Sequence, residues 1–339
     1  GVYHMVRSKS GVASMTARPD DLDDLARLSA RIGADPMLIQ AAGGNTSVKD
    51  GEVMWIKASG TLLADALKRD IFVACDLPAM RASLKNGDAR ADQSMEFALA
   101  QDGLRPSIET SLHAVFPQRV VLHAHCIHTL VHAIQADPIA AIGAKLEAFR
   151  WAIVPYVKPG ANLAMKVRSA VDRGCDVIIL CNHGVIVAAD TVSAADELLR
   201  NVARALSMDM VPLEAAKLGD LPEGWTAGPA SISHVACDPE LLAMATGGSL
   251  YPDHVIFCGV GALACNNPPY GDSPPFVLIP GKGTAMRTDA PPGAWALAQC
   301  LGDVLARMPE GTALNYLTLE QNGELLDWDA EKYRQVLNG

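Results

Sequence analysis

The stretch VIILCNHGVIV, residues 177–187, contains two apolar runs separated by a short polar segment. Residues 177–180 and 185–187 are rich in Val and Ile, whose branched side chains favour strands. The four residues between the runs, 181–184, leave room only for a tight connection. The stretch therefore predicts two strands joined by a turn that holds His183 rigidly, as a metal ligand must be held.

The sequence around this stretch alternates between strand and helix patterns. Strand patterns lie at residues 53–57, 120–123 and 154–156, and helical spacing lies at residues 20–33, 127–135, 161–173 and 193–210. Residues 41–47 indicate a turn, residues 61–100 look mainly helical, and a helix is expected to begin at Ser107 after Pro106. The pattern predicts a mixed α/β protein.

The length of 339 residues suggests two domains, at roughly 150 residues per domain. Gly and Pro recur in residues 217–231, which we interpret as a linker between a first domain at 18–216 and a second unit at 232–339. In the second unit we expect strands at 254–257 and 275–279, a helix at 293–308, and a C-terminal helix that includes residues 328–333. The role of this unit is not disclosed by its sequence.

Composition narrows the classes of partner. The formal charge of −10 argues against nucleic acid, whose binding depends on clustered Lys and Arg. No apolar stretch is long enough to span a membrane and no export signal is evident, so neither membrane insertion nor export is expected. Eight cysteines without a CxxC pair indicate reduced thiols, which fits a cytoplasmic setting.

The histidines provide the first chemical signal. His123 and His125 end an apolar strand pattern, and the two-residue period of a strand places both imidazoles on one face, within reach of one ion. An isolated pair of this kind suits simple hydrogen bonding equally well, and His183 alone would more often be a hydrogen-bonded turn residue. Together the three predict a metal site.

A carboxylate completes this set. Glu109 lies in PSIET, residues 106–110, in the expected first turn of a helix with Ser107 near the N-cap. Glutamate at such a position stabilises a helix by itself. Three histidines and one carboxylate nevertheless match a catalytic divalent-metal site, with Glu109 as ligand or general base.

Four motifs in a fixed order carry a family resemblance. GGNTS (43–47), PSIET (106–110), HAH (123–125) and NHG (182–184) resemble the class II aldolase/adducin family over about residues 20–215. The strings PYVKPG (155–160) and DWDAEKYRQ (327–335) further resemble the aldolase half of bifunctional rhamnulose-1-phosphate aldolase/alcohol dehydrogenase proteins. We expect no dehydrogenase half here, because no GxGxxG motif is present.

The resemblance implies a fold and a cofactor. The fold would be a three-layer α/β/α domain around a largely antiparallel sheet, followed by a smaller C-terminal α/β unit, in a homotetramer. His123, His125 and His183 would hold a divalent ion, usually zinc, with Mn2+, Co2+ or Mg2+ as alternatives. Glu109 would be the acid/base residue that also contacts the metal in the resting enzyme.

The resemblance also implies a substrate end of the site. Asn45, the Ser59–Gly60 turn and Ser107 would cradle a phosphate or its equivalent, and Lys57 would add positive charge. Members that act on fuculose phosphate have a second serine for phosphate where this chain has Ile108. The family's tyrosine from a neighbouring subunit has no clear counterpart, and Tyr156 and Lys158 are candidates for a second proton donor by proximity only.

The expected activity is that of an aldehyde-lyase. It would cleave or form a carbon–carbon bond of a hydroxyketone, such as a ketose phosphate or a keto acid, through a metal-stabilised enediolate. A sugar-phosphate 4-epimerase and a 3-oxo-acid-phosphate decarboxylase are alternatives, because both reactions use the same kind of intermediate. A non-catalytic adducin-like scaffold is the third hypothesis, and the intact set of three histidines and a glutamate argues against it.

Overall fold

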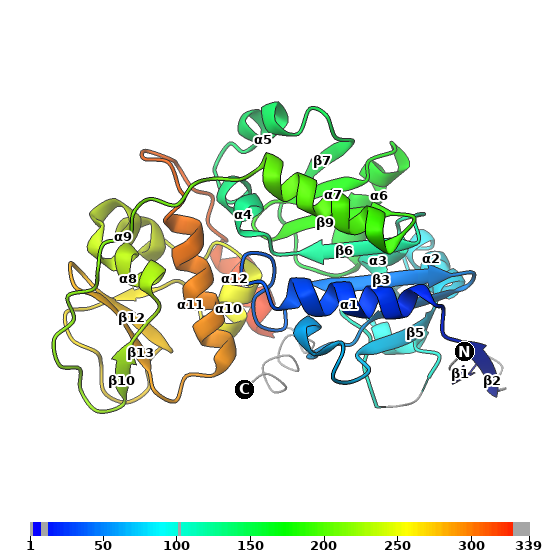
Figure 1. The fold of residues 1–339 in the computed structure, drawn as a ribbon, viewed down its shortest axis with the longest axis horizontal. Helices are drawn as coiled ribbons and strands as arrows, with labels where there is room; N and C mark the ends of the chain where they lie inside the picture. The colour runs from blue at the N-terminus through cyan, green and yellow to red at the C-terminus, as the bar shows by residue number, and fades with distance from the viewer. Residues whose placement is uncertain (1–2, 8–12, 101–102, 328–339) are drawn as a thin grey trace.

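A large sheet forms the centre of the computed structural model, which describes residues 3–7, 13–100 and 103–327 (Figure 1). Within these residues the sheet has seven strands, in the order β5 (Phe72–Asp76), β4 (Val53–Lys57), β3 (Asn45–Asp50), β6 (Val120–Ala124), β9 (Gly184–Ala189), β8 (Val177–Leu180) and β7 (Trp151–Val154). All neighbouring pairs are antiparallel except β8 and β7. The largely antiparallel sheet is thereby confirmed.

Residues 177–187, with which the sequence analysis began, form most of the hairpin of β8 and β9. Val177 lies opposite Val187, and Leu180 lies opposite Gly184. The turn between them contains Asn182, whose φ of 55° lies in the left-handed region, where Asn is tolerated better than most residues. The predicted pair of strands around a tight turn is confirmed.

Helices cover both faces of the large sheet. On one face, α1 (Asp21–Gly33) and α7 (Val192–Ala205) pack in one apolar cluster with alternate strand residues such as Leu122. On the other face, α2 (Leu77–Lys85), α3 (Thr110–Ala114) and α6 (Ala161–Asp172) share a second cluster with intervening residues such as Val121. Figure 1 shows α1 and α7 together on the near side of the sheet. The three-layer α/β/α fold is confirmed.

The first two hundred residues also contain shorter elements. They are the hairpin β1 (Tyr3–Arg7) and β2 (Ala13–Ala17), the helices α4 (Ile127–Ala133) and α5 (Ile139–Lys145), and the 3-10 turns η1 (Leu63–Asp65), η2 (Ala89–Asp92) and η3 (Ser94–Phe97). Among the described helices, none combines the length and the apolar character that crossing a membrane would require. All eight cysteines lie in described residues and are free thiols.

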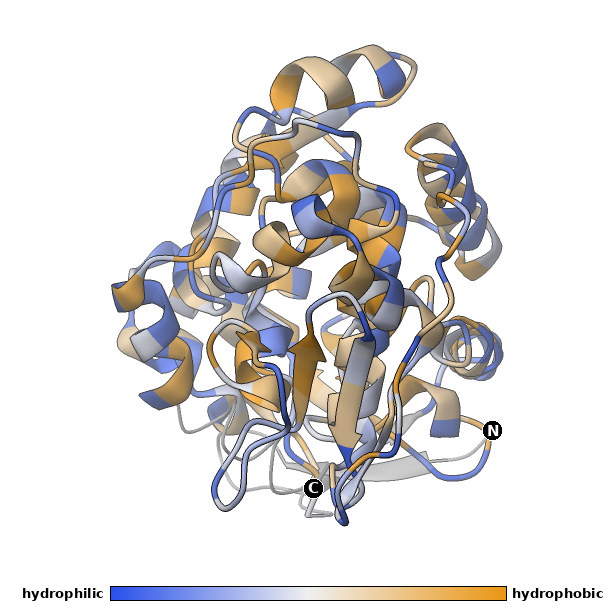
Figure 2. Ribbon diagram, turned by 90° about the vertical axis from the view of Figure 1, so that its left-hand side faces the viewer, coloured by the Kyte–Doolittle hydropathy of each residue, from blue (hydrophilic) through white to orange (hydrophobic). Residues whose placement is uncertain are grey.

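A smaller α/β unit follows, as expected. Its sheet has the order β10 (Trp225–Ala227), β13 (Gly283–Arg287), β12 (Phe276–Ile279) and β11 (Leu263–Ala264). Its helices are α8 (Ala230–Cys237), α9 (Pro239–Thr246), α10 (Pro252–Cys258), α11 (Pro292–Leu305) and α12 (Leu319–Asp327). Figure 2 looks onto this unit and shows hydrophobic residues in its strands and helices and more polar ones in the loops at the bottom.

Helix α4 belongs to the large unit in sequence but packs in the core of the small one. Leu130 and Val131 of α4 share an apolar cluster with Ile232 of α8 and Leu301 of α11. Strand β10 lies within the residues that we expected to form a linker. The boundaries at 216 and 232 remain a prediction.

Two strands of the large sheet were missed by the sequence patterns. Residues 45–47, expected in a turn, begin β3, and residues 72–76, expected in a mainly helical region, form β5. Strand β3 is polar, yet its hydroxyls are satisfied, because Thr46 Oγ1 lies 2.8 Å from Ser29 Oγ and Ser47 Oγ lies 2.7 Å from His113 Nδ1. Such tertiary contacts allow a buried strand without an apolar pattern.

Two further predictions need correction, one of a strand and one of the start of a helix. Residues 254–257, expected as a strand, lie in α10, whose first residue is Pro252. A short and mostly buried run has no readable period, so β-branched content misled the prediction. The helix expected from Ser107 begins at Thr110, which places Glu109 at the N-cap rather than in the first turn. The C-terminal helix expected at residues 328–333 lies outside the described residues.

Candidate metal centre

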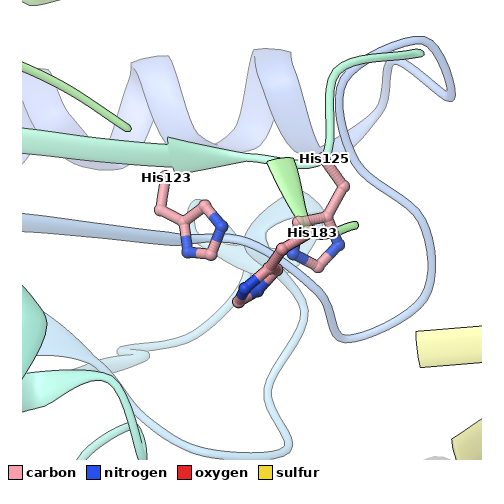
Figure 3. A group of neighbouring side chains, drawn as sticks. All are labelled: His123, His125 and His183. Atoms are coloured by element: carbon pink, nitrogen blue, oxygen red, sulfur yellow. The ribbon is translucent and has the colours of Figure 1, made fainter. Parts of the chain in front are cut away.

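Three imidazoles converge at one end of the large sheet. His123 lies near the end of β6, His125 follows that strand, and His183 lies in the turn between β8 and β9. Their ring centroids are 4.7–5.2 Å apart, and one nitrogen from each ring lies within 4.8 Å of the others. Figure 3 shows the three rings facing a common point. The predicted histidine cluster is therefore present.

The backbone around the rings is fixed by close contacts. The His125 N–H donates to Leu38 O at 2.9 Å, and the Gln40 amide donates to His125 O at 3.2 Å. A Cβ at Gly184 would collide with Ala124 O, so only glycine allows β9 to lie this close to β6. The position of the turn that carries His183 therefore depends on the residue that follows it.

Glu109 is hydrogen-bonded on both sides in the cluster. Its Oε2 lies 2.6 Å from His123 Nδ1 and accepts from Asn45 Nδ2 at 2.6 Å, while its Oε1 lies 3.3 Å from His183 Nε2. The Ser107 hydroxyl accepts from the Glu109 N–H at 3.1 Å. Helix α3 starts at the next residue, so the carboxylate is presented by a fixed N-cap.

Electrostatics keep this carboxylate ionised. Burial opposes ionisation of Glu109, but the positive charge of His123 and the hydrogen bonds from both histidines outweigh it and hold its pKa well below the usual range. Burial also lowers the pKa of His183, against the opposing effect of Glu109. These two directions favour an ionised Glu109 and an unprotonated His183, the states in which the two groups bind a divalent ion.

The cluster has donor atoms available for an ion. His123 Nε2 and His183 Nδ1 are buried and have no hydrogen-bond partner among the described residues. Leaving such atoms unsatisfied costs free energy, which an ion would recover. Nitrogen and carboxylate donors in this number suit Zn2+ and similar divalent ions. The residues therefore fit the metal that the sequence implies.

The residues expected at the substrate end line one pocket together with three members of the cluster: Asn45, Lys57, Ser59, Gly60 and Ser107 join Glu109, His125 and His183. Lys57 is 2% exposed, and its ammonium donates to Ala42 O at 3.1 Å. Ser59 Oγ is buried without a hydrogen-bond partner among the described residues. The pocket thus offers a cation and a free hydroxyl to an oxygen-rich or anionic group.

The remaining residues that the sequence singled out are divided between the pocket and its surroundings. Ile108 lines the pocket. Tyr156 and Lys158 are not among the lining residues, whereas Pro159 is. Tyr156 packs beside Val255 of α10, and the role expected of it stays a prediction.

Sequence reasoning missed Asp253. This residue lies in α10 of the small unit, lines the pocket, and places Oδ2 3.2 Å from His125 Nδ1. The only local signal was Pro252, a residue common at the start of a helix, and the strand-like run that follows obscured it.

The end of the α/β/α sheet thus carries a buried cluster of three histidines that could hold a metal ion, with a glutamate beside it. Residues 23–210, more than half of the chain, match the family model described as Class II Aldolase and Adducin N-terminal domain. The chain belongs to the class II aldolase/adducin family. This membership supports an aldolase-type function.

Two named proteins and one solved structure are similar to this chain. A Bacillus subtilis protein called uncharacterized oxidoreductase YuxG is 31% identical over 189 residues, which cover 51% of this chain but only 27% of that protein. An L-fuculose phosphate aldolase of Methanococcus maripaludis is 25% identical over 185 residues, covering 50% of this chain and 87% of that enzyme. The solved N-terminal class II aldolase domain of a conserved Thermoplasma acidophilum protein is 28% identical, with a TM-score of 0.50 over 57% of this chain and 95% of that domain.

Proposed function

We propose that the protein is a metal-dependent aldehyde-lyase that cleaves or forms a carbon–carbon bond of a hydroxyketone. The observation that carries the proposal is that residues of the candidate metal centre and a set of polar side chains line the same pocket. Glu109, His125 and His183 line it together with Lys57 and Ser59. A lyase of this kind needs both a metal ion and side chains that bind the part of the substrate away from the reacting carbons.

The histidines, Glu109 and Asn45 would each have a separate role in the reaction. A divalent ion, when bound to the three histidines, would supply Lewis-acid polarisation of a ketone and stabilise the negative charge that develops on it. Glu109 would accept and return the proton, since its low pKa leaves it ionised when substrate arrives. Asn45 would fix the carboxylate through its amide, which donates to Oε2.

The polar residues of the pocket other than the histidines and Glu109 support a substrate class. Lys57 and the Ser59 and Ser107 hydroxyls would bind a phosphate or carboxylate oxygen. Ile108 stands where a second phosphate-binding serine is found in members that act on fuculose phosphate, so the group bound has fewer hydroxyl contacts. We therefore propose a ketose phosphate or a keto acid as substrate. Zinc as native metal and a homotetrameric assembly are proposed from family membership alone.

The test combines metal analysis with a retro-aldol screen over phosphorylated and free ketoses and keto acids. We expect a bound divalent ion and two smaller carbonyl products from one substrate class, with activity lost after chelation and restored by zinc. An isomer as sole product would instead identify an epimerase, and carbon dioxide a decarboxylase. A metal-loaded protein that cleaves no compound of these classes would overturn the proposal.

A further inference from the structure

Helix α10 brings an acidic side chain from the small unit into the candidate metal centre. Asp253 is the second residue of α10, is 4% exposed, and lines the same pocket as Glu109. The family match ends at residue 210, so Asp253 lies outside the segment that identifies the family. The family likeness therefore assigns it no role.

Contacts with the chain segments on either side of α10 fix the position of this helix. Pro252 occupies the first turn, where its ring favours helical geometry. His254 Nε2 lies 2.6 Å from Gly261 O, and the Gly261 N–H donates to Ser249 Oγ at 2.7 Å. These contacts join the segment before α10 to the segment after it. Asp253 is thus presented by a rigid element, as a group that must orient another one requires.

The carboxylate of Asp253 faces a proposed ligand. Its Oδ2 lies 3.2 Å from His125 Nδ1, and both side chains are buried. The negative charge of a carboxylate at this distance attracts an N–H at Nδ1, and the tautomer with its proton on Nδ1 leaves the Nε2 lone pair for an ion. A Cβ at Gly43 would lie 2.6 Å from this Oδ2 and 2.8 Å from this Nδ1, so glycine is needed where the two groups meet.

A second contact from the small unit holds the turn of His183. Asn182, which precedes His183, donates its amide to Leu250 O at 2.9 Å and to Asn315 O at 2.7 Å. The Asn315 amide donates in return to Asn182 Oδ1 at 3.2 Å. Leu250 lies three residues before Asp253, so one short segment of the small unit supports two of the three histidines.

We propose that Asp253 is a positioning residue for the metal and that the small unit completes the metal centre. The Asp253 carboxylate holds the His125 ring in the orientation and tautomer that bind the ion. The inference rests on the proposed metal site but not on the proposed lyase reaction. It gives the small unit a function at the site.

The test measures metal affinity in the full-length chain rather than activity. Asp253→Asn keeps the shape of the side chain and removes its charge. We expect its dissociation constant for Zn2+ or Co2+, measured by competition with a chelator, to rise about tenfold or more. The control is Asp303→Asn, the same change at a buried acid of α11 in the same unit, and it should bind metal like the wild type.

Further measurements keep the outcome decisive. Thermal unfolding without metal shows whether each variant folds, and Asp253→Glu, which keeps a buried charge but moves the carboxylate relative to Nδ1, should also weaken binding. Wild-type affinity in a folded Asp253 variant, or an equal loss in Asp303→Asn, would overturn the inference. If the Asp253 variants weaken metal binding and the wild type cleaves no substrate, the inference stands and the proposed reaction falls.

Discussion

At the scale of single residues, Glu109 joins two of the histidines that are expected to hold the ion. Its carboxylate contacts Nδ1 of His123 and Nε2 of His183. The other nitrogen of each ring, Nε2 of His123 and Nδ1 of His183, is buried without a hydrogen-bond partner among the described residues, so each ring can hold the carboxylate and still offer a nitrogen to an ion. Asn45 donates to Oε2 of the carboxylate and limits how far this group can move.

A change at Glu109 separates metal binding from proton transfer. We expect Glu109→Gln to retain the metal, because three histidines remain, and to lose lyase turnover by about 10²–10⁴-fold, the usual contribution of a positioned acid/base group. Metal content and the rate of retro-aldol cleavage are measured on the same sample. Full activity with metal bound would show that Glu109 is not the proton carrier.

His113 gives a prediction for pH. Burial lowers its pKa from 6.5 to about 3, so the folded protein keeps it neutral where the unfolded chain takes up a proton. Between those two values the unfolded state binds more protons, and stability therefore falls as the pH falls from about 6.5 toward 3. His113→Gln removes this titration while leaving a polar partner for Ser47.

Urea denaturation with chelator present, repeated across that pH range, checks the difference. The variant should lose less stability than the wild type on going from pH 6.5 to 4, and the two should depend on pH alike above 7. Parallel curves over the whole range would mean that His113 is not the group that titrates.

At the scale of elements, the sequence predicts best where pattern and burial agree. The strands at 120–123 and 177–180 are apolar on both faces because helices cover both sides of the sheet, and their ends carry the histidines. Strand β3 has no such pattern, since its hydroxyls are satisfied by partners distant in sequence. The histidines and Glu109 could be predicted from local motifs, whereas Asp253 could not, because its contact joins residues 128 positions apart in a helix that was expected to be a strand.

The packing of β9 against β6 provides a test at this scale. Gly184→Ala would press a methyl group on the backbone at Ala124, beside His125. We expect a loss of about 1–3 kcal/mol in unfolding free energy, typical of overpacking, together with weaker metal binding.

Gly219→Ala is the control, because a Cβ there meets nothing within 4 Å. Its stability should stay within about 0.5 kcal/mol of wild type. Equal stability of the two variants would contradict the close approach.

At the scale of the whole molecule, the large and the small unit share a buried contact region. Leu130 and Val131 of α4 lie in the same apolar cluster as Leu301 of α11, and Asn182 bonds to Leu250 and Asn315. The candidate metal centre lies beside this junction, with the three histidines in the large unit and Asp253 in the small one. Family membership covers only the first side, so the second unit is where this chain differs from shorter relatives.

The shared core predicts cooperative unfolding. Because α4 is buried among helices of the small unit, the two units should melt together in one calorimetric transition in the presence of metal. Calorimetric and van't Hoff enthalpies of the full chain would then agree. Two separated transitions, with the metal-dependent one confined to the large sheet, would mean that the small unit is not required for the site.

The metal content of the purified protein tests the central claim most directly. Elemental analysis is made on the wild type and on the triple variant His123→Ala, His125→Ala and His183→Ala, each loaded with Zn2+ and freed of excess ion. The account predicts one bound ion per chain in the wild type and none in the triple variant. Full occupancy in the triple variant would contradict it.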